Sequence, residues 1–113
     1  MNWVQLNEET QLEKLSPLSF QKPVLIFKHS TRCSVSLMAK RSFENDWNFS
    51  KEEVIPYFLD LISFRNISNL VANQFHVEHE SPQLILIKDE KAIYHATHSD
   101  INFNELAKLV LGT

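Results

Sequence analysis

Residues 23–37 read P-V-L-I-F-K-H-S-T-R-C-S-V-S-L and decide the fold. The apolar run at residues 24–27 predicts a short strand, and the polar residues 28–32 predict a loop behind it. Cys33 follows at once, and apolar residues recur at helical spacing after it. A cysteine at a helix N-terminus lies beside free backbone N–H groups and the positive end of the helix dipole, which favours the thiolate. The stretch therefore predicts a strand, a tight loop and a reactive cysteine.

Several polar side chains accompany Cys33. Arg32 and His29 would add positive charge near the thiol, and Lys28 would add less, since alternation along a strand points it away from His29. Ser36, one helical turn further on, could donate a hydrogen bond to the thiolate. Each also has a structural interpretation: a solvated loop residue for the arginine, a plain first-turn residue for the serine and a packed ring for the histidine. A lone cysteine is itself more often a small buried hydrophobe, so its position before a helix carries the argument.

Composition limits the function classes. A chain of 113 residues suits one domain with a single core, and 43% hydrophobic with 22% charged residues is ordinary for a soluble protein. The net charge of −3, with no basic run, argues against a nucleic-acid partner. No apolar stretch approaches the ~20 residues that span a bilayer, and the N-terminus lacks a signal-peptide pattern. We therefore expect a cytoplasmic protein without nucleic-acid or membrane partners.

The numbers of cysteines and glycines exclude further function classes. The single cysteine allows no internal disulfide, which fits a reducing compartment. The single glycine, Gly112, excludes a Rossmann or P-loop phosphate cradle, because both need several glycines.

The remaining elements follow from periodicity and turn residues. A first helix is expected at residues 8–15 with Asn7 as its N-cap, and residues 16–23 then form a connector. Further helices are expected behind Cys33, around residues 65–75, and after Asn102, where Glu105 stands in capping-box position and Gly112 ends the helix. Further strands are expected at residues 54–59, 83–87 and 92–97, the last two as a hairpin.

Individual residues sharpen these expectations. Pro56 cannot donate to a sheet ladder, which places its strand at a sheet edge. The run at residues 83–87 is apolar on both faces, as in a central strand. Met38 and Phe43 are expected in the core behind Cys33. Helix 65–75 should carry its apolar residues on one face, namely Ile67, Leu70, Val71 and Phe75.

The predicted order is helix, β, α, β, α, β, β, α, which resembles the thioredoxin-type arrangement. This predicts a single α/β domain over residues 1–113, with a four-stranded mixed core sheet flanked by helices. In thioredoxin-like proteins the catalytic cysteine follows the first core strand, as Cys33 does, and a cis-proline precedes the third core strand. Ser81 and Pro82 occupy the second place, which implies a cis bond whose flanking backbone is free to pair with a bound peptide.

Three further segments stand out: F-K-H-S-T-R-C-S-V-S at 27–36, R-N-I-S-N-L-V-A-N-Q-F-H-V-E-H-E-S-P-Q at 65–83, and H-S-D-I at 98–101. Together they resemble the monothiol bacilliredoxin family of bacillithiol-system proteins, of the YtxJ type. The family usually has proline after the cysteine, whereas this chain has Ser34, which bears on the rigidity and redox tuning of the loop. The resemblance implies a thioredoxin-like fold and exchange of low-molecular-weight thiols on protein cysteines.

The missing second cysteine shapes the expected chemistry. A C-x-x-C protein resolves its own mixed disulfide, but here Ser36 stands at the second position. Cys33 would attack a mixed disulfide, and a second small thiol, bacillithiol or a glutathione-like compound, would regenerate it as co-substrate. Thr31 and Arg32 would stabilise the thiolate or contact the substrate. No tightly bound cofactor is expected, and the protein should be a monomer able to form a disulfide-linked dimer through Cys33.

Other function classes stay open. The H-x-x-H pairs His76/His79 and His95/His98 suggest a metal, but this spacing in a turn and at a strand end does not aim both rings at one point. Monothiol glutaredoxins hold iron–sulfur clusters between subunits, although the glycine pair they use is absent here. A redox-inactive scaffold that grips extended peptides is the main alternative. An arsenate-reductase-like or regulatory relative would instead bind anions at the Cys33 loop.

Overall fold

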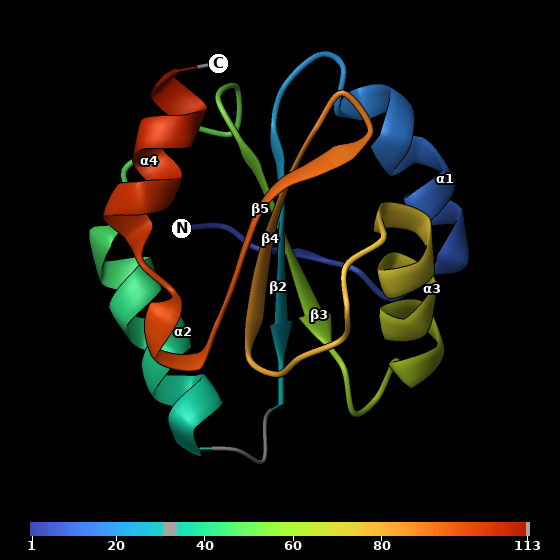
Figure 1. Cartoon of the computed structure of the whole chain (residues 1–113), viewed down its shortest axis with the longest axis horizontal. Coiled ribbons are helices and arrows are strands. Elements are labelled where there is room, and N and C mark those ends of the chain that lie inside the picture. Colours follow the sequence, from blue (N-terminus) through green and yellow to red (C-terminus); the bar gives the residue numbers. More distant parts are fainter. Residues whose placement is uncertain (31–33, 113) are drawn as a thin grey trace.

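The computed structural model shows a twisted mixed sheet between two pairs of helices (Figure 1). It describes residues 1–30 and 34–112, with their side chains apart from those of residues 35, 36 and 99. The elements are, in chain order, β1 (Val4–Gln5), α1 (Glu9–Leu18), β2 (Val24–His29), α2 (Ser34–Asp46), β3 (Ile55–Asp60), α3 (Arg65–Phe75), β4 (Gln83–Lys88), β5 (Lys91–Thr97), the 3₁₀ turn η1 (His98–Asp100) and α4 (Phe103–Leu111). The predicted order of helices and strands is confirmed, with one additional strand at the start.

The sheet has the strand order β1-β3-β2-β4-β5, so β2 lies at its centre. β3 runs parallel to β2 and β1 runs parallel to β3. β4 runs antiparallel to β2, and β5 returns antiparallel to β4 as the predicted hairpin. The turn residues Asp89 and Glu90 both adopt positive φ, at 51° and 65°, as a tight hairpin turn requires.

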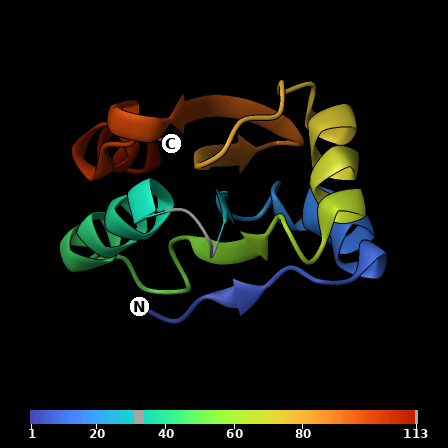
Figure 2. The ribbon, with the colours of Figure 1, turned by 90° about the horizontal axis from the view of Figure 1, so that it is seen from below.

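Figure 2 shows two helices on each side of the sheet. The buried side chains form a separate core on each face. Alternation along β2 sends Val24 and Ile26 toward α1 and α3, and Leu25 and Phe27 toward α2 and α4. The first core is mostly aliphatic. The second is rich in aromatic rings, among them Phe27, Phe43, Trp47, Phe49 and Phe103.

The start of the chain differs from the expectation. The N-cap of α1 is Glu8 and not Asn7, and the side chain of Gln11 accepts the backbone N–H groups of both residues at 2.9 and 2.8 Å. The helix also continues to Leu18, through residues predicted as a connector. Pro17 is tolerated because it stands in the last turn, where its missing N–H removes a single helical hydrogen bond.

The edge position predicted for the Pro56 strand is wrong for the whole sheet, because β1 pairs with β3 on its outer side. The reason behind the prediction still holds locally. Ile55 donates its N–H to Pro23 on the β2 side at 3.3 Å, so the nitrogen of Pro56 faces the other way. There β1 begins to pair only at Tyr57, which leaves no ladder bond for a proline to break.

Helix predictions were confirmed where apolar periodicity was clear. α3 has its predicted bounds and buries Ile67, Val71 and Phe75. Leu70 on this face is 38% exposed. Met38 is 71% exposed, so the expected core position of this residue is wrong, whereas Phe43 is buried as predicted. At α4, the side chain of Asn102 caps the helix as predicted.

No helix in the described parts of the chain has the length and apolar character to cross a membrane.

Candidate active site at the end of strand β2

Three chain segments meet at the end of the sheet where β2 stops (Figure 1). Lys28 of β2 is in register with Gln83, the first residue of β4, so the Ser81–Pro82 bond lies beside the last residues of β2. Gln83 is in turn in register with Thr97 of β5. His98, the first residue of η1, donates its backbone N–H to the carbonyl oxygen of Pro82 at 3.3 Å. The end of β2, the loop before β4 and η1 therefore form one continuous site.

The structure describes some of the predicted site residues and not others. The Ser81–Pro82 peptide bond is cis, as predicted, with Pro82 buried and Ser81 partly buried. Thr31, Arg32 and Cys33 lie outside the described residues. The backbone of Ser36 belongs to the first turn of α2, but its side chain lies outside the description.

Lys28 and His29 were predicted to lie in the loop, and this was wrong. Both belong to β2 and are buried, with 0% and 3% of their surface exposed. Parallel pairing with β3 extends the strand, since Lys28 and His29 align with Leu59 and Asp60. Backbone pairing on both sides of a central strand outweighs the polar character of two side chains.

Alternation separates these two residues, as the sequence predicted. The His29 ring lies on the aromatic face, 5.5 Å from the ring of Phe58 and 6.2 Å from that of Phe27, centroid to centroid. This environment favours the structural interpretation of His29.

Lys28 points to the other face and ends in a polar cluster. Its Nζ atom lies 3.2 Å from the carbonyl oxygen of Ser68 in α3 and 3.3 Å from Nδ1 of His79. The Ser68 hydroxyl lies 3.1 Å from Nδ1 of His79. Burial lowers the pKa of Lys28 to about 8, because an ammonium loses its hydration inside the protein.

Sequence reasoning missed this cluster, although part of the signal is present. Val24, Ile26 and Lys28 share one face of β2, so a strand two residues longer would have placed the lysine under the helices. Ser68 follows Ile67 in α3 and is buried together with the apolar residues of that helix. His79 was considered only as a metal ligand.

The described residues contain no group of three or more histidine, cysteine or acidic side chains placed to hold a metal ion. Of the two H-x-x-H pairs, His79 is engaged with Lys28 and Ser68. His76 ends α3 in the left-handed conformation, with a φ of 55°.

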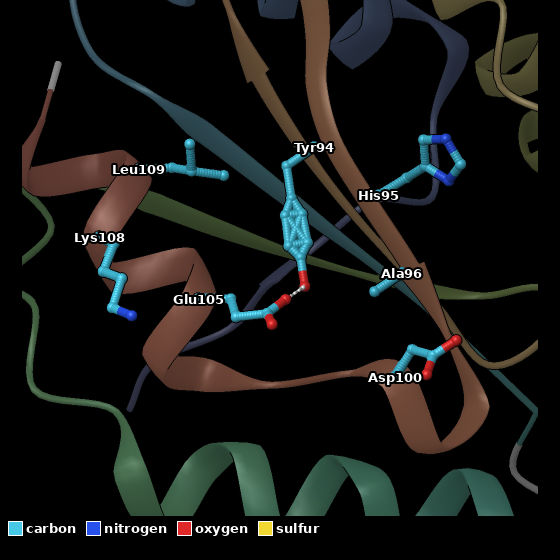
Figure 3. A pocket seen from close by; sticks show the side chains of 7 residues that line it. All are labelled: Tyr94, His95, Ala96, Asp100, Glu105, Lys108 and Leu109. Carbon is cyan, nitrogen blue, oxygen red and sulfur yellow. Dashed lines mark hydrogen bonds between the residues drawn. The ribbon is translucent and has the colours of Figure 1, made fainter.

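A separate hollow of about 420 Å³ lies between β5 and α4 (Figure 3). Its floor holds Tyr94, whose hydroxyl donates to Glu105 at 3.3 Å. Burial raises the pKa of Tyr94, with further contributions from Glu105 and Asp100. Asp100 belongs to η1, so the hollow adjoins the site at one end. Its lining is Tyr94, His95, Ala96, Asp100, Glu105, Lys108 and Leu109.

Comparison with known families identifies the chain. The model of the monothiol bacilliredoxin BrxC family matches residues 4–106. The chain belongs to the monothiol bacilliredoxin family. This match includes all three segments on which the resemblance was based.

Solved structures agree with this family fold. A thioredoxin-fold protein described as a candidate oxidoreductase is 28% identical, with a TM-score of 0.77 over 93% of this chain and 90% of that one. A thioredoxin from Malassezia sympodialis is 16% identical, with a TM-score of 0.73 over 98% and 90%. Spinach chloroplast thioredoxin f is 14% identical, with a TM-score of 0.68 over 98% and 85%.

The predicted thioredoxin-like α/β fold is therefore confirmed, with β1 added to the four-stranded core sheet. The family and the fold together support a role of the thiol–disulfide oxidoreductase type for this bacilliredoxin-family chain.

Proposed function

We propose that this protein removes or transfers a low-molecular-weight thiol, bacillithiol or a similar compound, from mixed disulfides on protein cysteines. One observation carries the proposal: the chain belongs to the monothiol bacilliredoxin family, and its single cysteine stands between β2 and α2. At that position a thiol precedes a helix of 13 residues, whose free N–H groups and dipole favour the thiolate.

The proposed cycle has two exchange steps. In the first, the Cys33 thiolate attacks the small-thiol sulfur of a protein mixed disulfide. A Cys33–small-thiol disulfide forms, the original S–S bond breaks, and the protein leaves as a thiolate that takes a proton from water. In the second step, the thiolate of another small-thiol molecule attacks this adduct. It releases the small-thiol disulfide and restores Cys33, so the small thiol is the reductant.

Neighbouring residues have assigned roles in the proposal. Arg32 stabilises the thiolate and attracts a carboxylate on the small thiol, while Thr31 and Ser36 stabilise the thiolate or contact the substrate. The backbone at Ser81 and Pro82 holds the partner chain in an extended conformation. The protein acts as a cytoplasmic monomer with no tightly bound cofactor, and oxidation links two copies through Cys33.

The test uses a protein carrying a bacillithiol mixed disulfide, with a glutathione mixed disulfide in parallel. Incubation with the intact chain should transfer the small thiol to Cys33, seen by mass spectrometry as an adduct of the corresponding mass. Added free thiol should then release it with continued turnover. Cys33→Ser should abolish the adduct and the turnover.

Two outcomes would contradict the proposal. The intact chain with free thiol could give neither adduct nor turnover. Alternatively, Cys33→Ser could bind and process the mixed disulfide as well as the natural chain does, in which case the domain is the redox-inactive peptide-binding scaffold. The ratio of rates on the two mixed disulfides identifies the preferred small thiol.

A further inference from the structure

The loop between α3 and β4, residues 76–82, carries the Ser81–Pro82 bond and is held by buried side chains from outside it. Gln83, with 1% of its surface exposed, donates through Nε2 to the carbonyl of Glu78 at 2.9 Å and accepts the N–H of Glu80 at 3.4 Å. Between these two anchored residues stands His79. The contacts of the His79 ring are therefore a further attachment of this loop, between the two that Gln83 makes.

Lys28 and Ser68 fix that ring through Nδ1, at 3.3 and 3.1 Å. An ammonium group has only donors, so the Lys28 contact requires a lone pair on Nδ1. The ring proton of neutral His79 is then on Nε2. Lys28 and Ser68 are 0% and 1% exposed, so both side chains reach the loop from inside the fold.

Burying Lys28 is costly, and packing alone does not require it. A charged group loses its hydration under α3, whereas an apolar side chain of similar length would fill the same space beside Ile26. In some proteins, polar groups buried at such a cost fix a local geometry. Here the geometry is that of the loop that ends in Pro82.

We propose that Lys28, Ser68 and His79 are positioning residues that hold the Pro82 loop in the shape that receives the partner chain of a mixed disulfide, and that protonation of His79 releases this hold. The inference rests on the proposed thiol exchange, because that function supplies the partner chain. It adds a pH-dependent control of partner binding, at residues other than those assigned to the exchange itself.

The direction of the pH effect follows from the groups around the ring. His79 is exposed on the loop, and a partial loss of hydration is the largest factor lowering its pKa; the cations Lys28 of β2 and Arg65 of α3 lower it further, against an opposing effect of Glu80 in the loop. Protonation places an N–H on Nδ1 directly against the Lys28 ammonium, so this hydrogen bond is lost. Partner binding should therefore weaken as the pH falls below the ~6.5 of an ordinary histidine.

The experiment measures KM and kcat for a protein mixed disulfide between pH 5 and 8, in the natural chain and in four variants. His79→Asn keeps an acceptor near the Nδ1 position and cannot be protonated there, whereas His79→Gln moves its acceptor away. Lys28→Met removes the donor and keeps the length of the side chain. His76→Asn is the matched control, since His76 is in the same loop and asparagine tolerates its left-handed φ.

The natural chain should show a KM that rises toward acid pH, whereas kcat, which falls as thiolate is lost, should follow the same pH profile in the natural chain and in His79→Asn. His79→Asn should keep the neutral-pH KM and lose this acid rise. His79→Gln and Lys28→Met should raise KM about tenfold already at pH 7, the loss expected for one hydrogen bond of ~1.4 kcal/mol. His76→Asn should behave as the natural chain. Thermal unfolding of each variant shows whether it is folded.

Three results would overturn the inference while the proposed function stands. The first is a natural chain that turns over with a KM independent of pH. The second is an acid rise in KM that persists unchanged in His79→Asn. The third is a KM at pH 7 that His79→Gln and Lys28→Met leave unchanged. Failure of the proposed function looks different, because the natural chain would then give no turnover at any pH, so alkylation of Cys33 by a small neutral reagent is measured alongside.

Discussion

The two faces of the sheet are stabilised by different chemistry, and β2 contributes to both with adjacent residues. Toward α2 and α4, His29 joins a set of aromatic rings whose centroids lie 5.5 to 6.2 Å apart. Toward α1 and α3, Lys28 ends in hydrogen bonds to Ser68 and His79. The aromatic face gains stability from area and shape, largely independent of pH, whereas the polar cluster depends on protonation and geometry.

This contrast separates stability from positioning. Apolar burial contributes most of the free energy of folding but is tolerant of exact geometry. The buried Lys28 contributes little to stability or lowers it, but its contact with His79 positions the loop that carries Pro82. The face with the lysine is also the face beneath the loop that carries Pro82.

Phe43→Ala should have the largest effect on stability. Phe43 is 2% exposed and its ring lies 6.2 Å from Phe27 and 5.6 Å from Phe103. Truncation removes this packing and leaves a cavity, which should lower the free energy of unfolding by ~3–4 kcal/mol. Urea unfolding at pH 6, 7 and 9 should give the same loss. Phe20→Ala, at a residue 54% exposed, is the control and should change little.

Lys28→Met should act in the opposite direction and depend on pH. The Lys28 pKa of about 8, against 10.5 unfolded, means that the unfolded chain binds more protons between these values, so natural stability rises with pH there. The desolvation cost present below pH 8 is about 3 kcal/mol at ~1.4 kcal/mol per pKa unit. After loss of the hydrogen bonds, we expect Lys28→Met to gain ~1–2 kcal/mol at pH 7.

The stability gained by Lys28→Met should shrink between pH 8 and 10.5, because Lys28 of the natural chain is deprotonated there and no longer buries a charge. Urea unfolding across this range measures it, with the exposed Lys91→Met on β5 as a control that shows no such trend. A Lys28→Met chain less stable than the natural one at pH 7 would mean that the cluster contributes net stability, and the contrast between the two faces would fail.

Asn102→Ala should have an intermediate effect near the surface of the aromatic face. The Asn102 side chain accepts the N–H groups of Asn104 at 2.8 Å and Glu105 at 3.3 Å. Loss of this N-cap should cost ~1 kcal/mol in thermal or urea unfolding. Asn104→Ala leaves the accepted N–H in place and serves as the control, so an equal loss in both variants would contradict the capping role.

Tyr94→Phe should have the smallest effect. The hydroxyl of this half-buried ring donates to Glu105 at 3.3 Å, at the open hollow of Figure 3. Because water replaces such a partner easily, we expect a change in unfolding free energy below ~0.5 kcal/mol. A loss above 1 kcal/mol would show that this hydrogen bond contributes as much to stability as those between Lys28, Ser68 and His79.

The sequence predicted the apolar elements of the fold better than the polar positions. Periodicity located α3 and the β4–β5 hairpin, because apolar burial leaves a regular trace in the chain. It failed at Lys28 and His29, where pairing with two neighbouring strands overrides side-chain polarity. It also failed at β1, since a two-residue strand has no period to detect.

Of the candidate site, one part was predicted from the sequence and another was not. The position of the Ser81–Pro82 loop follows from the fold and was predicted with its cis bond. The cluster of Lys28, Ser68 and His79 joins residues 11 to 51 positions apart, and no local spacing connects them. Only the packing of α3 against β2 brings them together.

The most direct test of the central claim is the pH dependence of Cys33 alkylation. The account predicts an inflection well below the ~8.5 of a free cysteine, moved upward by Arg32→Ala and unchanged by the control Arg41→Ala on α2. An unreactive thiol, or an inflection at or above ~8.5, would contradict an activated thiolate and favour a fold kept for peptide binding.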